Sequence, residues 1–170
     1  MSRTFEDFPV GARLCSNSLA ISTEAIIDFG RAFDPQLFHL DPTAAGETLF
    51  GGLVASGWQT SALSMRLFVE TMDVPGGMIG LAVDELRWPE AVRPGDELQV
   101  EIEIVEARLS KSRPGYGIIR YQSLTKNQRG ETVQSFFAVA LLPASHSTST
   151  SSSEEKSLGG EGFEPPTNTV

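Results

Sequence analysis

The chain has 170 residues, with 13 Lys and Arg against 22 Asp and Glu, which gives a formal net charge of −9. This length predicts one domain, or one domain with a tail. The acidic balance argues against a nucleic acid or an anionic membrane as the main partner, because both require clustered basic side chains. Cys15 is the only cysteine, which excludes a disulfide within the chain.

Nothing in the sequence points to export or to a membrane. No run of about 18 apolar residues is present, so we expect no transmembrane helix. The first residues lack the basic and apolar regions of a secretory signal. We therefore expect a cytoplasmic protein.

Composition changes sharply after Pro143. Residues 145–153 read SHSTSTSSS, in which eight of nine are Ser or Thr. A segment with so few apolar side chains cannot bury enough surface to offset the entropy lost on ordering. The sequence therefore predicts a folded domain over 1–143 and a disordered tail over 144–170.

The first elements of the domain are short. We expect an edge strand over 12–21, with Cys15 as a small buried residue. Apolar residues at helical spacing predict a helix over 22–33, capped by its first Ser or Thr and ended by Asp34-Pro35. A long connection follows over 34–52, in which Pro42 can begin a short helical turn.

The strongest helix candidate covers 53–72. Its apolar residues extend well beyond one stripe, so we expect a central helix that is buried on most sides. Arg66 and Glu70 stand four residues apart and predict an ion pair on its polar edge.

The pattern then changes to an alternation of apolar and polar residues. Strands are predicted over 80–88, 97–107, 117–125 and 132–142. Short turns rich in Gly and Pro separate them, which indicates antiparallel pairing. The fold class is therefore α+β, with an antiparallel sheet wrapped around the helix over 53–72.

Asp34 and His39 form the most informative motif. They lie five residues apart in a proline-bounded loop, and His39 is the only histidine of the predicted domain. A carboxylate and an imidazole can hold a water molecule and move its protons. On these residues alone, an Asp that caps a turn and a His that packs in the loop are the more common case, because one Asp and one His in a loop occur often. A metal site would need more ligands than Asp41 adds, so we expect no metal.

Small residues surround Ser56 and Gly57 at the start of the central helix. They would let a ligand approach backbone amides at the positive end of the helix dipole, where a developing oxyanion is stabilised. Close packing of the helix on the sheet would also explain them. They match no phosphate-loop or dinucleotide fingerprint, and we expect no cofactor. Trp58 and Trp88 are interpreted as core or interface aromatics.

These segments together resemble the MaoC-like dehydratases, the group that includes the R-specific enoyl-CoA hydratases. The family pattern is Asp-x-Asn-Pro-x-His, followed by an aliphatic residue and Asp, and later by a His-Gly or Ser-Gly step at the central helix. The matching segments here are 34–42 and Ser56-Gly57, supported by the turn over 93–98. Gln36 replaces the usual Asn and Leu37 the usual Pro, which leaves Asp34 and His39 in place but puts the substrate in question.

The resemblance implies a single hot-dog fold, a homodimer and an acyl-CoA thioester as substrate. It further implies that Asp34 and His39 hold one water molecule and add it across the double bond of a 2-enoyl-CoA. The Gly57 amide would bind the thioester oxygen, with Ser56 and Gln36 also among the substrate-binding residues. The activity would be that of a hydro-lyase, acting as an enoyl-CoA hydratase or an acyl dehydratase.

Two other functions remain compatible with the sequence. A hot-dog thioesterase commonly uses a carboxylate on the central helix, and here only Glu70, near the far end of that helix, is available. A non-catalytic protein that binds acyl-CoA would have the same fold without turnover.

Overall fold

The computed structural model describes residues 3–145. Helices and strands are mixed, which confirms the α+β prediction. In chain order the elements are η1 (Phe5–Asp7), β1 (Arg13–Cys15), β2 (Leu19–Ala20), α1 (Thr23–Phe33), α2 (Leu37–Leu40), α3 (Pro42–Ala45), α4 (Gly57–Met72), β3 (Ile79–Arg87), β4 (Glu97–Leu109), β5 (Tyr116–Lys126) and β6 (Thr132–Pro143).

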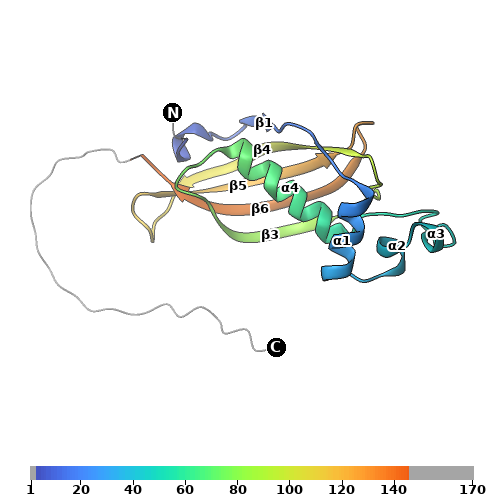
Figure 1. Cartoon of the computed structure of the whole chain (residues 1–170). Helices are drawn as coiled ribbons and strands as arrows, with labels where there is room; N and C mark the ends of the chain where they lie inside the picture. Colours follow the sequence, from blue (N-terminus) through green and yellow to red (C-terminus); the bar gives the residue numbers. More distant parts are fainter. Residues whose placement is uncertain (1–2, 146–170) are drawn as a thin grey trace, which may run out of the picture.

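One antiparallel sheet forms the body of the molecule. Its strands follow the order β1-β4-β5-β6-β3, and β2 also pairs with β4. Figure 1 shows α4 lying across one face of this sheet, with β3 along one edge and β1 along the other. The predicted sheet around a central helix is therefore confirmed.

The alternation in the sequence explains which face of the sheet packs on α4. Four apolar residues of β4 are fully buried, while the residues between them lie on the outer face; the buried four are Leu98, Val100, Ile102 and Ile104. From the next strand, Tyr121 stacks on Phe68 of α4 with ring centroids 4.5 Å apart. Burial of these apolar side chains against α4 supplies the main driving force for the fold.

Three of the helices gather at the end of the sheet where α4 begins (Figure 1). The predicted helix over 22–33 is present as α1, with Ser22 accepting a hydrogen bond from the Ala25 N–H at 3.1 Å. Gln59 of α4 donates to the Ala25 carbonyl at 2.7 Å and so holds α1 against the start of α4. Pro42 begins α3, as the sequence predicted.

The central helix begins later than the predicted 53–72, because α4 starts at Gly57. The four preceding residues are buried but belong to no helix or strand. Their backbone groups bond to neighbouring segments, with the Val54 N–H donating to the Phe38 carbonyl and the Ala55 N–H to the Val92 carbonyl. Ser56 then caps the helix by accepting from the Trp58 N–H at 3.2 Å.

The expectation that this helix is buried on most sides is wrong. Three apolar side chains of α4 are exposed, namely Trp58, Met65 and Val69. Three more are exposed on β3, an edge strand of the sheet, namely Ile79, Leu81 and Val83. The sheet covers only one face of the helix, so the opposite face keeps its apolar residues in contact with solvent. The ion pair of Arg66 with Glu70 is present at 2.9 Å.

Two further expectations need correction. Cys15 lies in a strand as predicted, but its side chain is exposed, because β1 is an edge strand that packs through its neighbour Leu14. At the other end, Ala144 is buried and its N–H donates to the Gly115 carbonyl at 2.9 Å, although it was assigned to the tail. The rest of the predicted tail, 146–170, lies outside the described residues.

Within residues 3–145, none of the helices combines the length and apolar character needed to cross a bilayer.

Candidate active site

Asp34 and His39 lie together at the end where α4 begins. Asp34 ends α1 as its C-cap residue, and His39 lies in the short helix α2. The His39 imidazole is buried, at 4 % exposure. Its Nε2 atom lies 3.3 Å from Oδ2 of Asp34. The loop that joins the two helices therefore folds the carboxylate and the imidazole against each other.

A backbone carbonyl fixes the orientation of the imidazole. Nδ1 of His39 lies 2.6 Å from the carbonyl oxygen of Val54. Because a carbonyl oxygen only accepts hydrogen bonds, Nδ1 carries the hydrogen and donates it. In the neutral ring, Nε2 therefore has a lone pair directed at Asp34. A water molecule placed at this pair can donate one hydrogen to Nε2 and one to the carboxylate.

Two further side chains hold the Asp34 carboxylate. Gln36 donates from Nε2 to Oδ1 at 2.8 Å, and Ser56 donates from Oγ to Oδ2 at 2.7 Å. These two hydrogen bonds, chiefly that from Gln36, lower the pKa of Asp34 below its ordinary value, while partial burial opposes them; a charged His39 ring would lower it further. The carboxyl group is therefore ionised at neutral pH and ready to accept a proton.

The N-terminus of α4 faces the same place. Gly57 is the first residue of the helix, and the first amides of a helix have no partner within it. A Cβ at Gly57 would lie 2.8 Å from the Trp88 ring, so only glycine fits against this indole. The absence of a side chain at Gly57 therefore allows close packing. It also leaves the Gly57 backbone amide accessible at the positive end of the helix dipole.

All five residues named from the sequence line one cavity of about 330 Å³. They are Asp34, Gln36, His39, Ser56 and Gly57. The cavity also includes residues that the sequence did not single out as site residues, namely Val54, Trp58, Trp88 and the segment 89–92. The Val54 carbonyl could not be found from the sequence, because it acts through its backbone. The two tryptophans were noted, but only as core or interface aromatics.

The arrangement suits acid–base chemistry beside an oxyanion site. A carboxylate and a correctly oriented imidazole can bind and deprotonate a water molecule. The helix N-terminus can stabilise negative charge that develops on a nearby oxygen. Within the described part of the chain, no three His, Cys, Asp or Glu side chains are grouped so that they could hold a metal ion.

Comparisons with known proteins agree with this description. The family model described as MaoC like domain matches residues 7–127. The uncharacterized protein YdeM of Bacillus subtilis is 30 % identical over 125 residues, which cover 73 % of this chain and 87 % of that protein.

Solved structures extend the likeness to the fold. The MaoC-like dehydratase from Rhodospirillum rubrum is 45 % identical, with a TM-score of 0.80 over 85 % of this chain and 99 % of that one. The R-hydratase PhaJ1 from Pseudomonas aeruginosa is 26 % identical, with a TM-score of 0.70 over 92 % of this chain and 96 % of that one. The chain therefore belongs to the MaoC-like domain family and has its hot-dog fold, and this membership supports a role as a hydratase or dehydratase.

Proposed function

We propose that this protein is a hydro-lyase that adds water to a 2-enoyl-CoA thioester, or removes it from a 3-hydroxyacyl-CoA. The observation that carries the proposal is the pair formed by Asp34 Oδ2 and His39 Nε2, 3.3 Å apart in a cavity at the start of α4. In the neutral ring both atoms are acceptors, and together they can bind the two hydrogens of one water molecule.

The reaction then follows from the two acceptors. Asp34 and His39 take a proton from the bound water as its oxygen forms a bond to C3 of the enoyl group. The electrons of the C2–C3 double bond move towards the thioester carbonyl, and an enolate develops. The pair then returns a proton to C2, which completes the addition. General acid–base assistance of this kind typically contributes 10²–10⁴-fold to a rate.

Gly57 serves the enolate in this proposal. Its amide at the N-terminus of α4 donates to the thioester oxygen. This hydrogen bond strengthens as negative charge develops on the oxygen, so it stabilises the transition state more than the substrate. Ser56 and Gln36 keep Asp34 in place and ionised through their hydrogen bonds to its carboxylate.

The geometry gives less support to a thioesterase. Such a reaction would use a carboxylate of α4, and Glu70 is the candidate that the sequence offers. The Glu70 side chain is 55 % exposed and paired with Arg66 at 2.9 Å. It lies near the far end of α4 and is absent from the lining of the cavity that holds Asp34 and His39.

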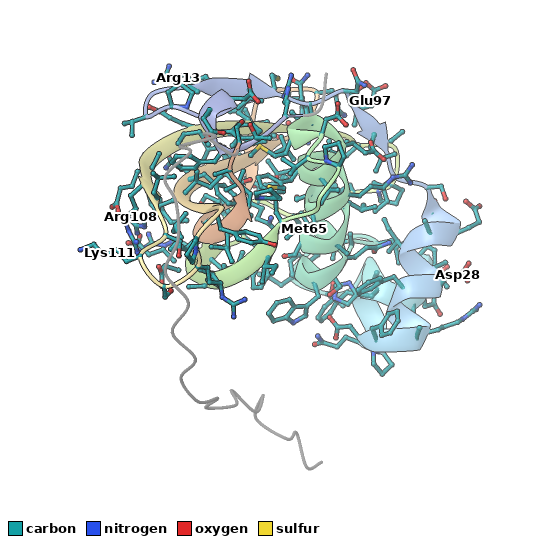
Figure 2. The ribbon with its side chains drawn as sticks, turned by 90° about the vertical axis from the view of Figure 1, so that its left-hand side faces the viewer. Arg13, Asp28, Met65, Glu97, Arg108 and Lys111 are labelled. Atoms are coloured by element: carbon teal, nitrogen blue, oxygen red, sulfur yellow. The ribbon has the colours of Figure 1, made fainter. Side chains whose placement is uncertain are left out.

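We also propose that the protein is a homodimer. β3 is an edge strand of the sheet, with unpaired backbone groups along one side. β3 also lies near the exposed apolar residues of α4, because Gly80 lines one shallow cavity with Met65, which Figure 2 labels, and Val69. A second copy that covers both would remove them from water. Sedimentation equilibrium should give the mass of two chains, and the mass of one chain would contradict the proposal.

The hydration proposal is tested with the full chain and Asp34→Asn. Loss of absorbance of the conjugated thioester is followed after mixing with 2-enoyl-CoA substrates of several chain lengths. We expect turnover by the wild type and a rate lower by roughly 10²–10⁴-fold in Asp34→Asn, because an amide cannot accept the proton.

Asp28→Asn is the matched control for this variant. The control makes the same Asp-to-Asn change on α1, the helix that Asp34 ends. The Asp28 side chain faces solvent away from the sheet, as Figure 2 shows. The control should keep the wild-type rate. A folded wild type that hydrates none of the substrates, while binding them, would favour a non-catalytic acyl-CoA-binding protein.

A further inference from the structure

A buried amide next to the candidate site has an unused donor. Gln134 of β6 is fully buried, at 0 % exposure. Its Oε1 atom accepts from Ser61 Oγ at 2.6 Å and from Trp88 Nε1 at 3.0 Å. Among the described residues, its Nε2 atom has no hydrogen-bond partner. A buried donor without a partner costs free energy, so such groups are rare and call for an explanation.

The orientation of this amide is fixed by chemistry. The indole N–H of Trp88 only donates, and so the atom that faces it has to be the oxygen of Gln134. Reversing the amide would place two donors against each other. Nε2 of Gln134 therefore points away from Trp88 with both hydrogens free.

Two contacts tie Gln134 to the candidate site. Trp88 lines the cavity that contains Asp34 and lies against Gly57. The single hydroxyl hydrogen of Ser61 lies within reach of two acceptors, Oε1 of Gln134 at 2.6 Å and the Gly57 carbonyl oxygen at 3.0 Å. A thioester held at the Gly57 amide would therefore start its acyl chain beside Trp88. Gln134 itself is not part of the cavity lining, so a chain reaches it only if the Trp88 indole turns outward. That indole lines the cavity, bonds to Gln134 and is 39 % exposed.

We propose that Nε2 of Gln134 binds an oxygen on the acyl chain of the substrate. The preferred substrate is then a 2-enoyl thioester whose chain carries a hydroxyl or carboxylate, rather than an alkyl chain of the same length. An oxygen would satisfy the free N–H groups, whereas a methylene would bury them without a partner. This inference rests on the proposed hydration and names the substrate class of that site.

The test compares two thioesters with chains of equal length. Hex-2-enoyl-CoA ends in a methyl group, and 5-hydroxypent-2-enoyl-CoA carries a hydroxyl at the same position. The monothioester of pent-2-enedioic acid adds a carboxylate arm. The ratio of kcat/KM for each oxygenated chain to that for hexenoyl is measured in the wild type and in Gln134→Met. We expect a wild-type ratio above ten for at least one oxygenated chain, and a fall of about tenfold in the variant.

Two further variants sharpen the comparison. Gln122→Met makes the same exchange on β5, where alternation puts residue 122 on the outer face of the sheet; it should keep the wild-type ratio. Gln134→Glu keeps an acceptor for Trp88 and Ser61 but removes the amide donor and adds a negative charge, so it should lower the ratio for the chain that ends in a carboxylate as Gln134→Met does. It replaces Gln134→Met if that variant fails to fold. If neither folds, the wild-type ratio alone decides.

The outcomes separate this inference from the proposed hydration. A wild-type ratio near one, or a ratio unchanged in a folded Gln134 variant, would overturn the inference and mean that Nε2 contacts a structural water only. If the wild type hydrates none of the thioesters, the hydration proposal fails. Titration calorimetry with the same compounds then gives the ratio of their dissociation constants. A ratio near one in the wild type, or a ratio that is unchanged in a folded Gln134 variant, would again overturn the inference.

Discussion

Two hydrogen bonds hold the carboxylate of Asp34 in its ionised form. Gln36 and Ser56 donate to it, and His39 lies beside it. The resulting low pKa has a consequence for stability. Because the folded-state pKa is lower than the ordinary 3.8, the ionised group stabilises the fold fully above that pH. This stabilisation is lost as the pH falls through the lower, folded-state pKa.

Ser56→Ala should separate the two roles of this serine. The variant loses the cap of α4 and one donor to Asp34. We expect the free energy of unfolding to fall by about 0.5–2 kcal/mol from the lost cap. We also expect the pKa of Asp34 to rise towards its ordinary value. A carbon-detected NMR titration of the side-chain carboxyl measures the pKa, and thermal unfolding measures the stability.

Ser22→Ala is the matched control, because it removes a serine cap from α1. Ser22 accepts from the Ala25 N–H, and no hydrogen bond joins it to Asp34. It should lower stability to a similar extent and leave the pKa of Asp34 unchanged. Equal titration curves for Asp34 in both serine variants would contradict the role assigned to Ser56.

At the scale of single residues, the polar side chains of the cavity were predictable from the sequence, and the backbone group that orients His39 was not. The spacing of Asp34 and His39 suggested the pair, and the cavity contains both. The Val54 carbonyl that orients the imidazole belongs to a residue with no polar side chain. Such a contact depends on where the chain before α4 passes, which only the folded structure determines.

Between elements, the contact of α1 with α2 is the one that positions the site. Gly30 of α1 is buried against α2. A Cβ at Gly30 would lie 2.9 Å from the His39 carbonyl oxygen and 3.0 Å from the His39 Cβ. The helix that carries the imidazole can therefore approach α1 only because residue 30 has no side chain.

Gly30→Ala should therefore disturb His39. Alanine favours a helix interior by about 1 kcal/mol over glycine. The collision with backbone atoms of His39 costs more, typically about 1–3 kcal/mol for an overpacked core. We expect a net loss of stability and a displaced imidazole. Thermal unfolding and the ring-proton NMR signals of His39 measure both, and the chain has only 2 histidines to assign.

Asp28→Ala controls for helix propensity on α1. Asp28 is exposed, and its only salt bridge within residues 3–145 is a contact of 3.9 Å with Arg31. This variant should keep the His39 signals and lose no stability. If Gly30→Ala were as stable as the wild type with the same His39 signals, the close approach of the two helices would not depend on glycine.

The periodicity of the sequence predicted which helices and strands exist, but it did not always predict the residues at which they begin and end. The apolar run over 53–72 continues through the helix start, so nothing in its pattern marks residue 57 as the first of α4. The preceding residues are as apolar as the helix because they are buried too. Their non-helical path is stabilised by backbone hydrogen bonds to Phe38 and Val92, which lie far away in the sequence.

For the whole molecule, the sequence showed how much of α4 is apolar but not which face is covered. A sheet packs on one face of a helix only. The remaining apolar residues, such as Met65 and Val69, stay exposed in a single chain. The width of the apolar face therefore exceeds what one sheet can bury, which is why we attribute the excess to a second copy.

The C-terminal end of the domain lies later than composition suggested. Ala144 is buried, and its N–H bonds to Gly115 in the turn before β5. Ser145 donates through both N–H and Oγ to Glu6, each at 3.0 Å. The Ser145 backbone is the main reason that the pKa of Glu6 is lowered to about 2. Ser145 thus joins the N-terminal segment to the end of β6, and Ala144 joins that end to the turn before β5.

Two truncations test this boundary. A chain that ends at Ser145 should keep the unfolding temperature of the full chain, because the residues removed are too polar to build a core. A chain that ends at Pro143 loses the buried Ala144 and also Ser145, which donates two hydrogen bonds to Glu6. We expect it to unfold at a lower temperature at neutral pH, and the pKa of Glu6 to return towards its ordinary 4.5.

The pH dependence distinguishes the two losses. A lowered pKa means that the Glu6 contact stabilises the fold fully above pH 4.5, and that this contribution disappears as the pH falls towards about 2. The difference between the two truncations should therefore shrink over this range, but not vanish, because the burial of Ala144 does not titrate. A difference that is constant with pH would mean that Ser145 does not act on Glu6. If both truncated chains unfolded at the same temperature at neutral pH, the folded domain would end at Pro143.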